Sequence, residues 1–148
     1  MTKNKTGVTY ENIKYYVSED NRVTACVLEC FIDYKYVQPM YGLSIENRSR
    51  FLKVLEDLNI SMDACGLYFQ TRGISKVNNG DTYNKVFGER LALSKAQQLA
   101  FGKANRMYWH LTNLVANEIE KLDLYVSGTY NVTDHCENHV EELIESSN

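Results

Sequence analysis

The chain has 148 residues, of which 44% are hydrophobic and 24% charged, and its formal net charge is -3. This length and composition predict one ordinary soluble globular domain that can bury a hydrophobic core. The small net charge gives no reason to expect a DNA partner. No apolar run approaches the length of a membrane-spanning helix, so we expect no membrane partner either. Four cysteines without a CxxC pair fit a reducing cytoplasm.

The first half of the chain is expected to form an antiparallel sheet and one helix. The residues 22–33 are apolar on both alternating sides, which predicts a central strand covered on both faces. Ser44 is placed to cap a helix that runs to about Asn59. Alternation of side chains predicts three strands. They cover residues 10–17, 22–33 and 66–77.

A long helical run is predicted over residues 83–122, which contain no proline. Its first part carries small residues at every fourth position, and these form one ridge along a helix. Such a ridge suits either tight helix pairing or helix-on-sheet packing. Asp81 or Thr82 is expected to cap the helix. The ridge consists of Gly88, Ala92, Ala96, Ala100 and Ala104.

The predicted fold class is α+β. An antiparallel sheet of three or four strands packs against a long C-terminal helix, or a helical hairpin, and against a shorter crossover helix. Beyond Leu122 we expect a short extended piece over 123–130 and a last short helix from Asp134. The single domain 1–148 is expected to divide into a loose N-terminus 1–7, a mainly sheet part 8–77 with one helix, the helical run 83–122 and a C-terminal extension 123–148.

No catalytic motif is found in the sequence. It contains no phosphate-binding loop, no GxSxG turn and no HExxH pair. His135 and His139 have a spacing that can bind zinc on a helix, and Cys136 lies between them, but no fourth ligand is evident nearby. We therefore expect these three residues to be solvated, and we expect no metal, no cofactor and no enzymatic activity.

The sequence is rich in tyrosine, with eleven residues of this type. Aromatic rings interleaved with cationic side chains are the chemistry of nucleotide sites, where rings stack on bases and cations meet phosphates. The same residue types are enriched in protein interfaces, and they also occur as ordinary core and surface residues. Composition alone leaves all three interpretations open.

One part of the chain resembles a known group of proteins. The strand end Thr71-Arg72-Gly73-Ile74-Ser75-Lys76, the turn Gly80-Asp81-Thr82-Tyr83 and the run GERLALSKAQQLAFGKA resemble small proteins of phages and prophages of Gram-positive bacteria. The closest functional candidate among them is the first type of anti-Thoeris protein. That family sequesters cyclic ADP-ribose-type immune signals in pockets between the subunits of an oligomer, and some members also hold cyclic oligonucleotides.

The resemblance covers Arg72–Ala104 in detail and the rest only in layout. Positions of the helix and strand motifs match, and most of them are structural. The chain departs from the pattern where Tyr83 replaces the usual Phe and where an acidic segment follows Asp123. The matching positions are Gly73, Tyr83, Gly88, Leu91, Ala92, Lys95 and Ala96.

The resemblance implies a phage-encoded anti-defence protein in the cytoplasm of a bacterial host. It would bind a cyclic nucleotide signal without cleaving it, and it would self-associate, with the small-residue ridge at the subunit interface. On chemical grounds we expect phosphates on Arg72, Arg90, Lys95 and Arg106, and the base on Tyr83, Phe87 or Trp109. The alternative is a small protein inhibitor that grips a host defence or replication protein through the loop tyrosines Tyr34, Tyr36 and Tyr41.

Overall fold

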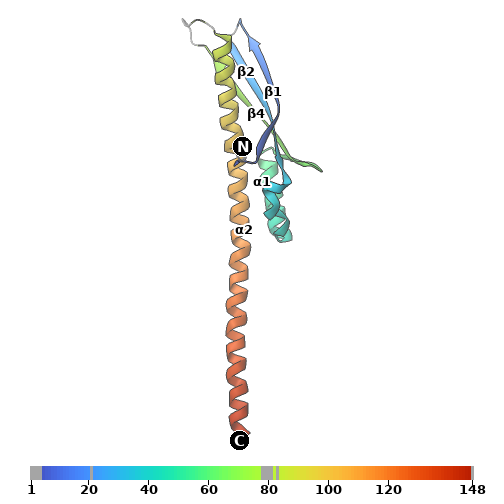
Figure 1. The fold of residues 1–148 in the computed structure, drawn as a ribbon, viewed down its shortest axis with the longest axis vertical. Helices are drawn as coiled ribbons and strands as arrows, with labels where there is room; N and C mark the ends of the chain where they lie inside the picture. Colours follow the sequence, from blue (N-terminus) through green and yellow to red (C-terminus); the bar gives the residue numbers. More distant parts are fainter. Residues whose placement is uncertain (1–4, 21, 78–81, 83, 148) are drawn as a thin grey trace.

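The computed structural model describes residues 5–20, 22–77, 82 and 84–147. It shows a head and a stalk (Figure 1): a sheet and a short helix lie beside the first part of a very long helix, whose second part extends alone. The predicted α+β class is confirmed. The elements in chain order are β1 (Val8–Ser18), β2 (Val23–Asp33), the 3-10 helix η1 (Tyr34–Gly42), α1 (Ile45–Asp57), β3 (Ser61–Met62), β4 (Gly66–Lys76) and α2 (Lys85–Ser146).

The sheet has four antiparallel strands in the order β1-β2-β4-β3. Strand β2 is central, as its apolar sequence predicts, and it pairs along its whole length with β4. The expectation that both faces of β2 are covered is wrong. Its residues Leu28 and Ile32 are fully buried in the core, whereas Val27 and Phe31 on the opposite face are only half-buried. Strand β3 was not predicted, because two residues are too short to show an alternating pattern.

Helix α2 packs along the face of the sheet that carries Leu28. The ridge residues Ala92, Ala96 and Ala100 are completely buried there. A Cβ atom at Gly73 of β4 would lie 2.0 Å from the carbonyl oxygen of Ala92, so the two backbones approach closely only because Gly73 has no side chain. The ridge therefore serves helix-on-sheet packing. The expected use of the ridge between subunits is wrong, because the sheet already covers it.

The start and the length of α2 differ from the prediction. Asn84 caps the helix, with its Oδ1 accepting from the backbone N–H of Phe87 at 3.1 Å. Of the expected caps, Asp81 lies outside the described residues and Thr82 lies before the observed cap. The helix continues through 123–130 without a break, so the expected extended piece and the separate last helix are wrong. The 62 residues correspond to a length of about 93 Å.

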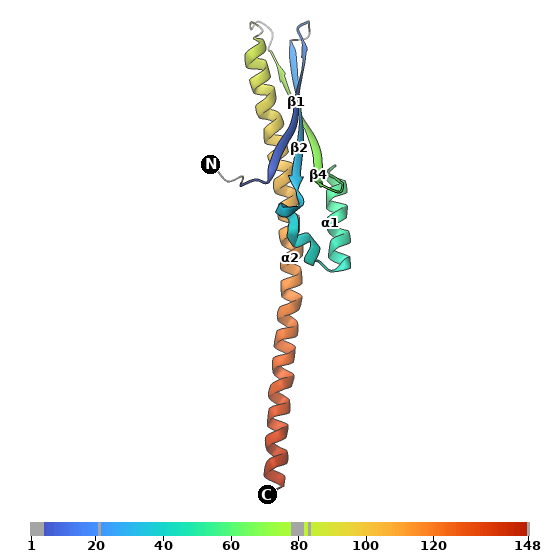
Figure 2. The same cartoon turned by 45° about the vertical axis from the view of Figure 1, so that its right-hand side comes forward.

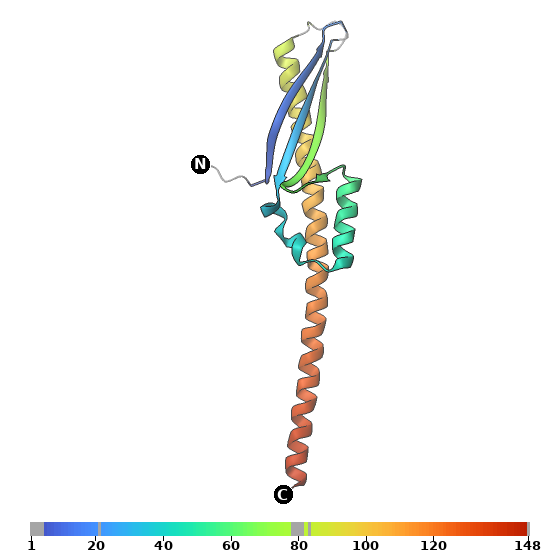
Figure 3. The same cartoon turned by 90° about the vertical axis from the view of Figure 1, so that its right-hand side faces the viewer.

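Helix α1 lies beyond the end of the sheet, beside the middle of α2 (Figure 3). The predicted cap is confirmed, since the Ser44 hydroxyl accepts from the N–H of Asn47 at 3.2 Å. Glu118 of α2 holds the start of α1 by hydrogen bonds. Its Oε1 accepts from the N–H of Ser44 at 2.8 Å and from Nδ2 of the buried Asn47 at 2.7 Å. These hydrogen bonds fix the lower edge of the head to the helix.

From Leu122 onward every described side chain of α2 is exposed, and Figure 2 shows this part of the helix extending away from all other elements. We call residues 122–146 the stalk. Many of its exposed side chains are apolar. None of the described helices is both long and apolar enough to cross a membrane.

Candidate functional site at the open edge of strand β4

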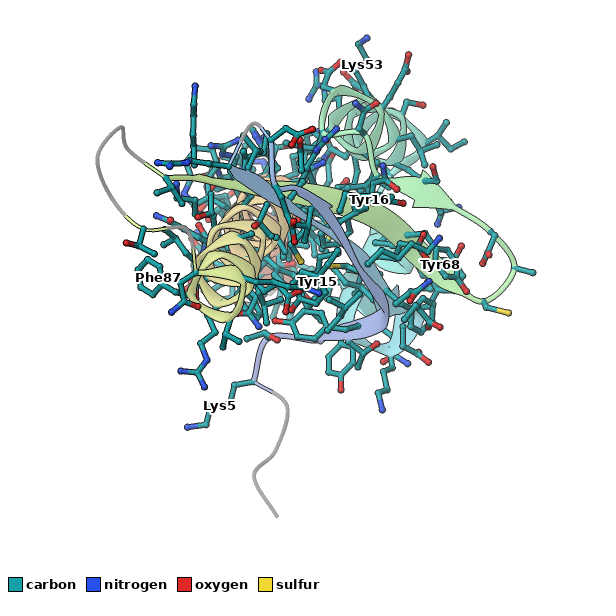
Figure 4. All side chains as sticks on the ribbon, turned by 90° about the horizontal axis from the view of Figure 1, so that it is seen from above. Lys5, Tyr15, Tyr16, Lys53, Tyr68 and Phe87 are labelled. Atoms are coloured by element: carbon teal, nitrogen blue, oxygen red, sulfur yellow. The ribbon has the colours of Figure 1, made fainter. Side chains whose placement is uncertain are left out.

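The predicted ligand residues near the start of α2 lie at one end of the head. Phe87 is 63% exposed, and Arg90, one turn later, is also exposed. In the view down the long axis, Phe87 and Tyr68 lie on opposite sides of the head (Figure 4). Tyr83 lies outside the described residues. Arg72 is on the other side of the sheet from α2, where it pairs in register with the half-buried Val27.

Two other predicted ligand residues have local partners. The Nζ atom of Lys95 donates to the carbonyl oxygen of Ile74 at 3.0 Å, so this cation satisfies an acceptor of β4. Trp109 is 60% exposed and makes an edge-on ring contact with His110, with 5.1 Å between the ring centroids.

The predicted residues do not form one site within one chain. At about 1.5 Å of rise per residue, Phe87 and Arg106 are separated by roughly 28 Å along α2. A mononucleotide-sized ligand cannot touch both. Among the predicted residues only Arg106 lines a cavity of the described structure that combines several polar groups.

That cavity is an open hollow of about 650 Å³ between β4 and α2, which we call the edge hollow. Its size falls within the range of ligand pockets. Strand β3 pairs only with Leu67 and Tyr68, so in the described sheet the rest of this edge of β4 has no neighbouring strand. The edge hollow is lined by Gln70, Thr71, Gln98, Leu99, Gly102, Lys103 and Arg106.

The two cations of the edge hollow come from successive turns of α2. Lys103 and Arg106 are three residues apart and therefore lie on one side of the helix. Across the hollow, the Thr71 hydroxyl donates to the carbonyl oxygen of Ala96 at 2.7 Å, which fixes β4 against the helix. The Lys103 ammonium lies 5.7 Å from the ring centroid of Phe69. The packing of β4 on α2 thus holds both cations at the strand edge.

Neither Lys103 nor Arg106 forms an ion pair with a carboxylate of the described residues. Burial lowers the pKa of Lys103, and the nearby Arg106 lowers it further, while Cys30 acts in the opposite direction. Burial also raises the pKa of Cys30 to about 11, so its thiol stays protonated near neutral pH. The lining of the edge hollow therefore contains two cationic side chains and no carboxylate.

A second hollow of about 750 Å³ adjoins the first and shares Gln70 and Lys103 with it. We call it the acidic hollow. Its carboxylates are Glu11 and Glu29, and Glu29 is 3.8 Å from the ammonium of the exposed Lys14. Carboxylates accept hydrogen bonds from hydroxyl and amino groups. The acidic hollow is also lined by Cys30, Asn59, Ser61, Tyr68 and Phe69.

Comparison with protein-family models, with curated proteins and with solved structures found no match to this chain.

Within the described residues, no group of three or more His, Cys, Asp or Glu side chains is arranged to hold a metal ion. His135, Cys136 and His139 lie on the exposed stalk, where the Nδ1 atom of His139 is 4.0 Å from a carboxylate oxygen of Glu142.

Of the residues that line the edge hollow, the sequence-based prediction named only Arg106 as a ligand residue. Lys103 could have been paired with Arg106 from their three-residue spacing alone. The sequence around Gln70 and Gln98 gave no indication that they line a hollow. Their position there depends on β3 ending early and leaving the edge of β4 open.

Proposed function

We propose that this protein binds an anionic nucleotide signal at the edge hollow and sequesters it without chemical change. The observation that carries the proposal is the pair Lys103 and Arg106, two cations without a carboxylate partner in the described structure, at the rim of a ligand-sized hollow. A phosphate supplies the missing negative charge, and a guanidinium binds phosphate oxygens in a two-pronged geometry.

Each hollow binds a different part of the nucleotide. Phosphates bind Arg106 and Lys103 in the edge hollow, with the amides of Gln70 and Gln98 as further donors. The sugar and base extend over Gln70 into the acidic hollow, where carboxylates accept from ribose hydroxyls and Tyr68 offers a ring face. This division suits cyclic ADP-ribose isomers and cyclic di- or trinucleotides, which combine phosphates with sugars and bases.

Sequestration needs affinity rather than catalysis. A dissociation constant in the nanomolar range corresponds to about -12 kcal/mol. Charge-assisted hydrogen bonds to phosphates and stacking on a ring supply binding energy of the required kind. A phage protein of this kind, made in the cytoplasm of a bacterial host, removes the signal from a defence effector by mass action.

Calorimetric titration with cyclic ADP-ribose isomers and cyclic oligonucleotides tests this function. We expect Arg106→Ala to weaken binding about tenfold or more, because a charge-assisted hydrogen bond contributes roughly 1.5–3 kcal/mol. Arg90→Ala is the matched control, since Arg90 is an exposed arginine of the same helix, roughly 24 Å away along its axis. Equal affinities of wild type and Arg106→Ala, or no binding of any of these nucleotides, would overturn the proposal.

A second candidate is the inhibition of a host defence or replication protein. The observation that favours it is the uncovered face of the sheet, where Tyr16 is 56% and Ile74 is 48% exposed. The loop tyrosines fit less well, because the Tyr34 hydroxyl donates to the carbonyl oxygen of Asp63 and only Tyr41 is largely exposed.

The two candidates predict opposite results in a cell-based assay of anti-defence activity. If the protein inhibits another protein through this face, Tyr16→Asp abolishes activity and Arg106→Ala retains it. If it sequesters a nucleotide, Arg106→Ala abolishes activity and Tyr16→Asp retains it.

A further inference from the structure

An apolar stripe follows the stalk in alternating steps of three and four residues. This is the heptad period of a coiled coil, in which two positions of each heptad, a and d, form the seam between helices. The a positions are Ile119, Val126, Thr133 and Val140, and the d positions are Val115, Leu122, Thr129, Cys136 and Leu143. We call these nine residues the seam.

The apolar seam residues of the stalk are exposed in the single chain. Leu122, Val126 and Leu143 are 60%, 65% and 55% exposed. Figure 2 shows no other element beside the stalk. An apolar helix stripe of this length in water is typical of a surface that another helix covers.

We propose that the seam joins two copies of this chain in a parallel, in-register, two-stranded coiled coil. The residue types select this arrangement among coiled coils. All four a positions are β-branched, and the d positions at both ends of the stalk, Leu122 and Leu143, are leucine. β-branched residues at a with leucine at d favour parallel dimers over trimers and tetramers.

The two threonines at the centre of the seam are compatible with burial. The Thr129 hydroxyl donates to the carbonyl oxygen of Tyr125 at 2.8 Å, and the Thr133 hydroxyl donates to that of Thr129 at 2.8 Å. Because each hydroxyl is already bonded within its own helix, burial leaves no donor unsatisfied. Each threonine then presents its methyl group to the partner helix.

The charges of the stalk lie mostly away from the seam. Residues 123–146 contain six carboxylates and no lysine or arginine. Only Asp123 and Glu137 occupy positions that flank the seam. In the parallel register the nearest side chains of the partner are Glu118 for Asp123 and Val132 for Glu137, and Glu118 is already held by α1. Within the seam's flanking positions, like charges therefore meet at one kind of pair, Asp123 with the partner's Glu118.

The stalk sequence needs a partner to remain helical. The run 125–133 consists of Tyr, Val, Ser, Gly, Thr and Asn, which all belong to the weaker part of the helix-propensity scale. A helix with such a sequence is marginal in water without tertiary packing. Pairing along the seam supplies that packing.

The buried area is sufficient for a stable dimer. Burying a Val, Leu or Ile side chain removes roughly 60–120 Å² of apolar surface from water. Five such residues of each seam are more than half exposed in the single chain, and they give roughly 600–1,200 Å² for the pair of chains. They are Ile119, Leu122, Val126, Val140 and Leu143. The methyl groups of Thr129 and Thr133 and the thiol of Cys136 raise this area into the range of specific interfaces, about 1,200 Å² and above.

The stripe continues into the head. An apolar hollow of about 350 Å³ opens between α2 and η1, and it is lined on the helix side by Tyr108, Thr112, Val115 and Ile119, which continue the seam spacing. Pro39 of η1 lies on its other side. In a parallel dimer both heads lie at the same end, so each hollow faces the partner's helix.

Size-exclusion chromatography with light scattering tests the dimer. Wild type is expected to have twice the 17.1 kDa mass of the chain. Val126→Asp should give the single-chain mass because it places a carboxylate in the seam. Leu124→Asp is the matched control: Leu124 is 71% exposed but points away from the seam, so this variant should stay dimeric. A monomeric wild type, a trimer, or a dimer that Val126→Asp leaves intact would overturn the proposal.

Oxidation of Cys136 tests whether the two helices of the dimer are parallel and in register. In a parallel, in-register pair the two Cys136 thiols face each other, so diamide should form one disulfide between chains by accepting two electrons and two protons from the thiols. The reaction is run in a Cys65→Ser variant, because Cys65 is the other exposed cysteine and Cys26 and Cys30 are buried. Covalent dimer is expected on a denaturing gel, and additional Cys136→Ser should abolish it. A light-scattering dimer that forms no disulfide would overturn the parallel register.

Discussion

At the scale of single residues, the contact between β4 and α2 depends on Gly73. The backbone of α2 occupies the space where a side chain would lie, with the N atom of Ala96 2.5 Å and the carbonyl oxygen of Ala92 2.0 Å from an added Cβ. Thr71, two residues earlier on the same face of β4, is bonded to the helix backbone. Backbone atoms cannot move aside without displacing the helix.

We predict that Gly73→Ala destabilises the head by roughly 1–3 kcal/mol, the usual cost of overpacking a core. Gly102→Ala is the control, because no described atom outside its own stretch of helix lies within 4 Å of a Cβ at that position. That variant should be neutral or slightly stabilising. Urea unfolding of the three proteins measures the difference, and equal midpoints of Gly73→Ala and wild type would contradict the described packing.

Glu118 gives the head a defined pH dependence. Hydrogen bonds from the hydroxyl and the N–H of Ser44, and then from Asn47, lower the pKa of Glu118 from 4.5 to about 2. In the unfolded chain Glu118 takes up its proton first, near its ordinary pKa, so its contribution is complete above about pH 4.5 and is lost as the pH falls toward 2.

Glu118→Gln removes this titration while keeping a hydrogen-bond acceptor. The stability difference between wild type and Glu118→Gln should therefore favour wild type at neutral pH and shrink toward zero at low pH. Chemical unfolding of both proteins over a pH series measures this difference in stability. The other carboxylates titrate in both proteins, so their contributions cancel in the difference. A difference that stays constant across the acid range would show that Glu118 is not hydrogen-bonded to α1.

At the scale of elements, long periodic segments could be predicted from the sequence. The point where the predicted helix ends could not. The alternation in β2 and β4 and the cap at Ser44 are confirmed, because each is a local property of the sequence. The break expected after Leu122 is wrong. The prediction took Gly128 as a break, whereas the helix continues through it. A glycine weakens a helix locally, but it does not end one whose spacing continues on both sides.

The candidate site shows the same limit. Arg106 could be named from its charge and its helix. Gln70 lines the same hollow, but its place there depends on where β3 stops pairing with β4. Likewise Lys95 was expected to bind phosphate, whereas it bonds to the carbonyl oxygen of Ile74. Such roles depend on which strand edge is left open, and only the assembled sheet determines that.

Gly128→Ala tests whether the stalk is one continuous helix. Glycine costs about 1 kcal/mol relative to alanine within a helix. Gly128 lies off the seam, and nothing surrounds a Cβ there. Hydrogen exchange of the peptides around residue 128 should therefore slow by about fivefold, with the head unchanged. Unchanged or faster exchange at 128 would place a break in the helix there.

At the scale of the whole molecule, the head and the stalk carry separate tasks. The head packs β4 against α2 and so presents Lys103 and Arg106 at a strand edge, while the stalk presents an apolar seam on the far half of the same helix. The two proposals can fail independently. Arg106 does not belong to the seam spacing, and Val126 is roughly 30 Å from Arg106 along α2.

Native mass spectrometry of the purified protein, with and without cyclic ADP-ribose isomers and cyclic di- and trinucleotides, tests the proposed function most directly. The account predicts a dimer that carries the intact mass of one of these nucleotides, and loss of that added mass in Arg106→Ala but not in Arg90→Ala. A monomer that carries the nucleotide would contradict the proposed dimer but not the proposed function. Wild-type protein that retains none of these nucleotides in any assembly state would contradict the central claim that the chain sequesters a nucleotide signal.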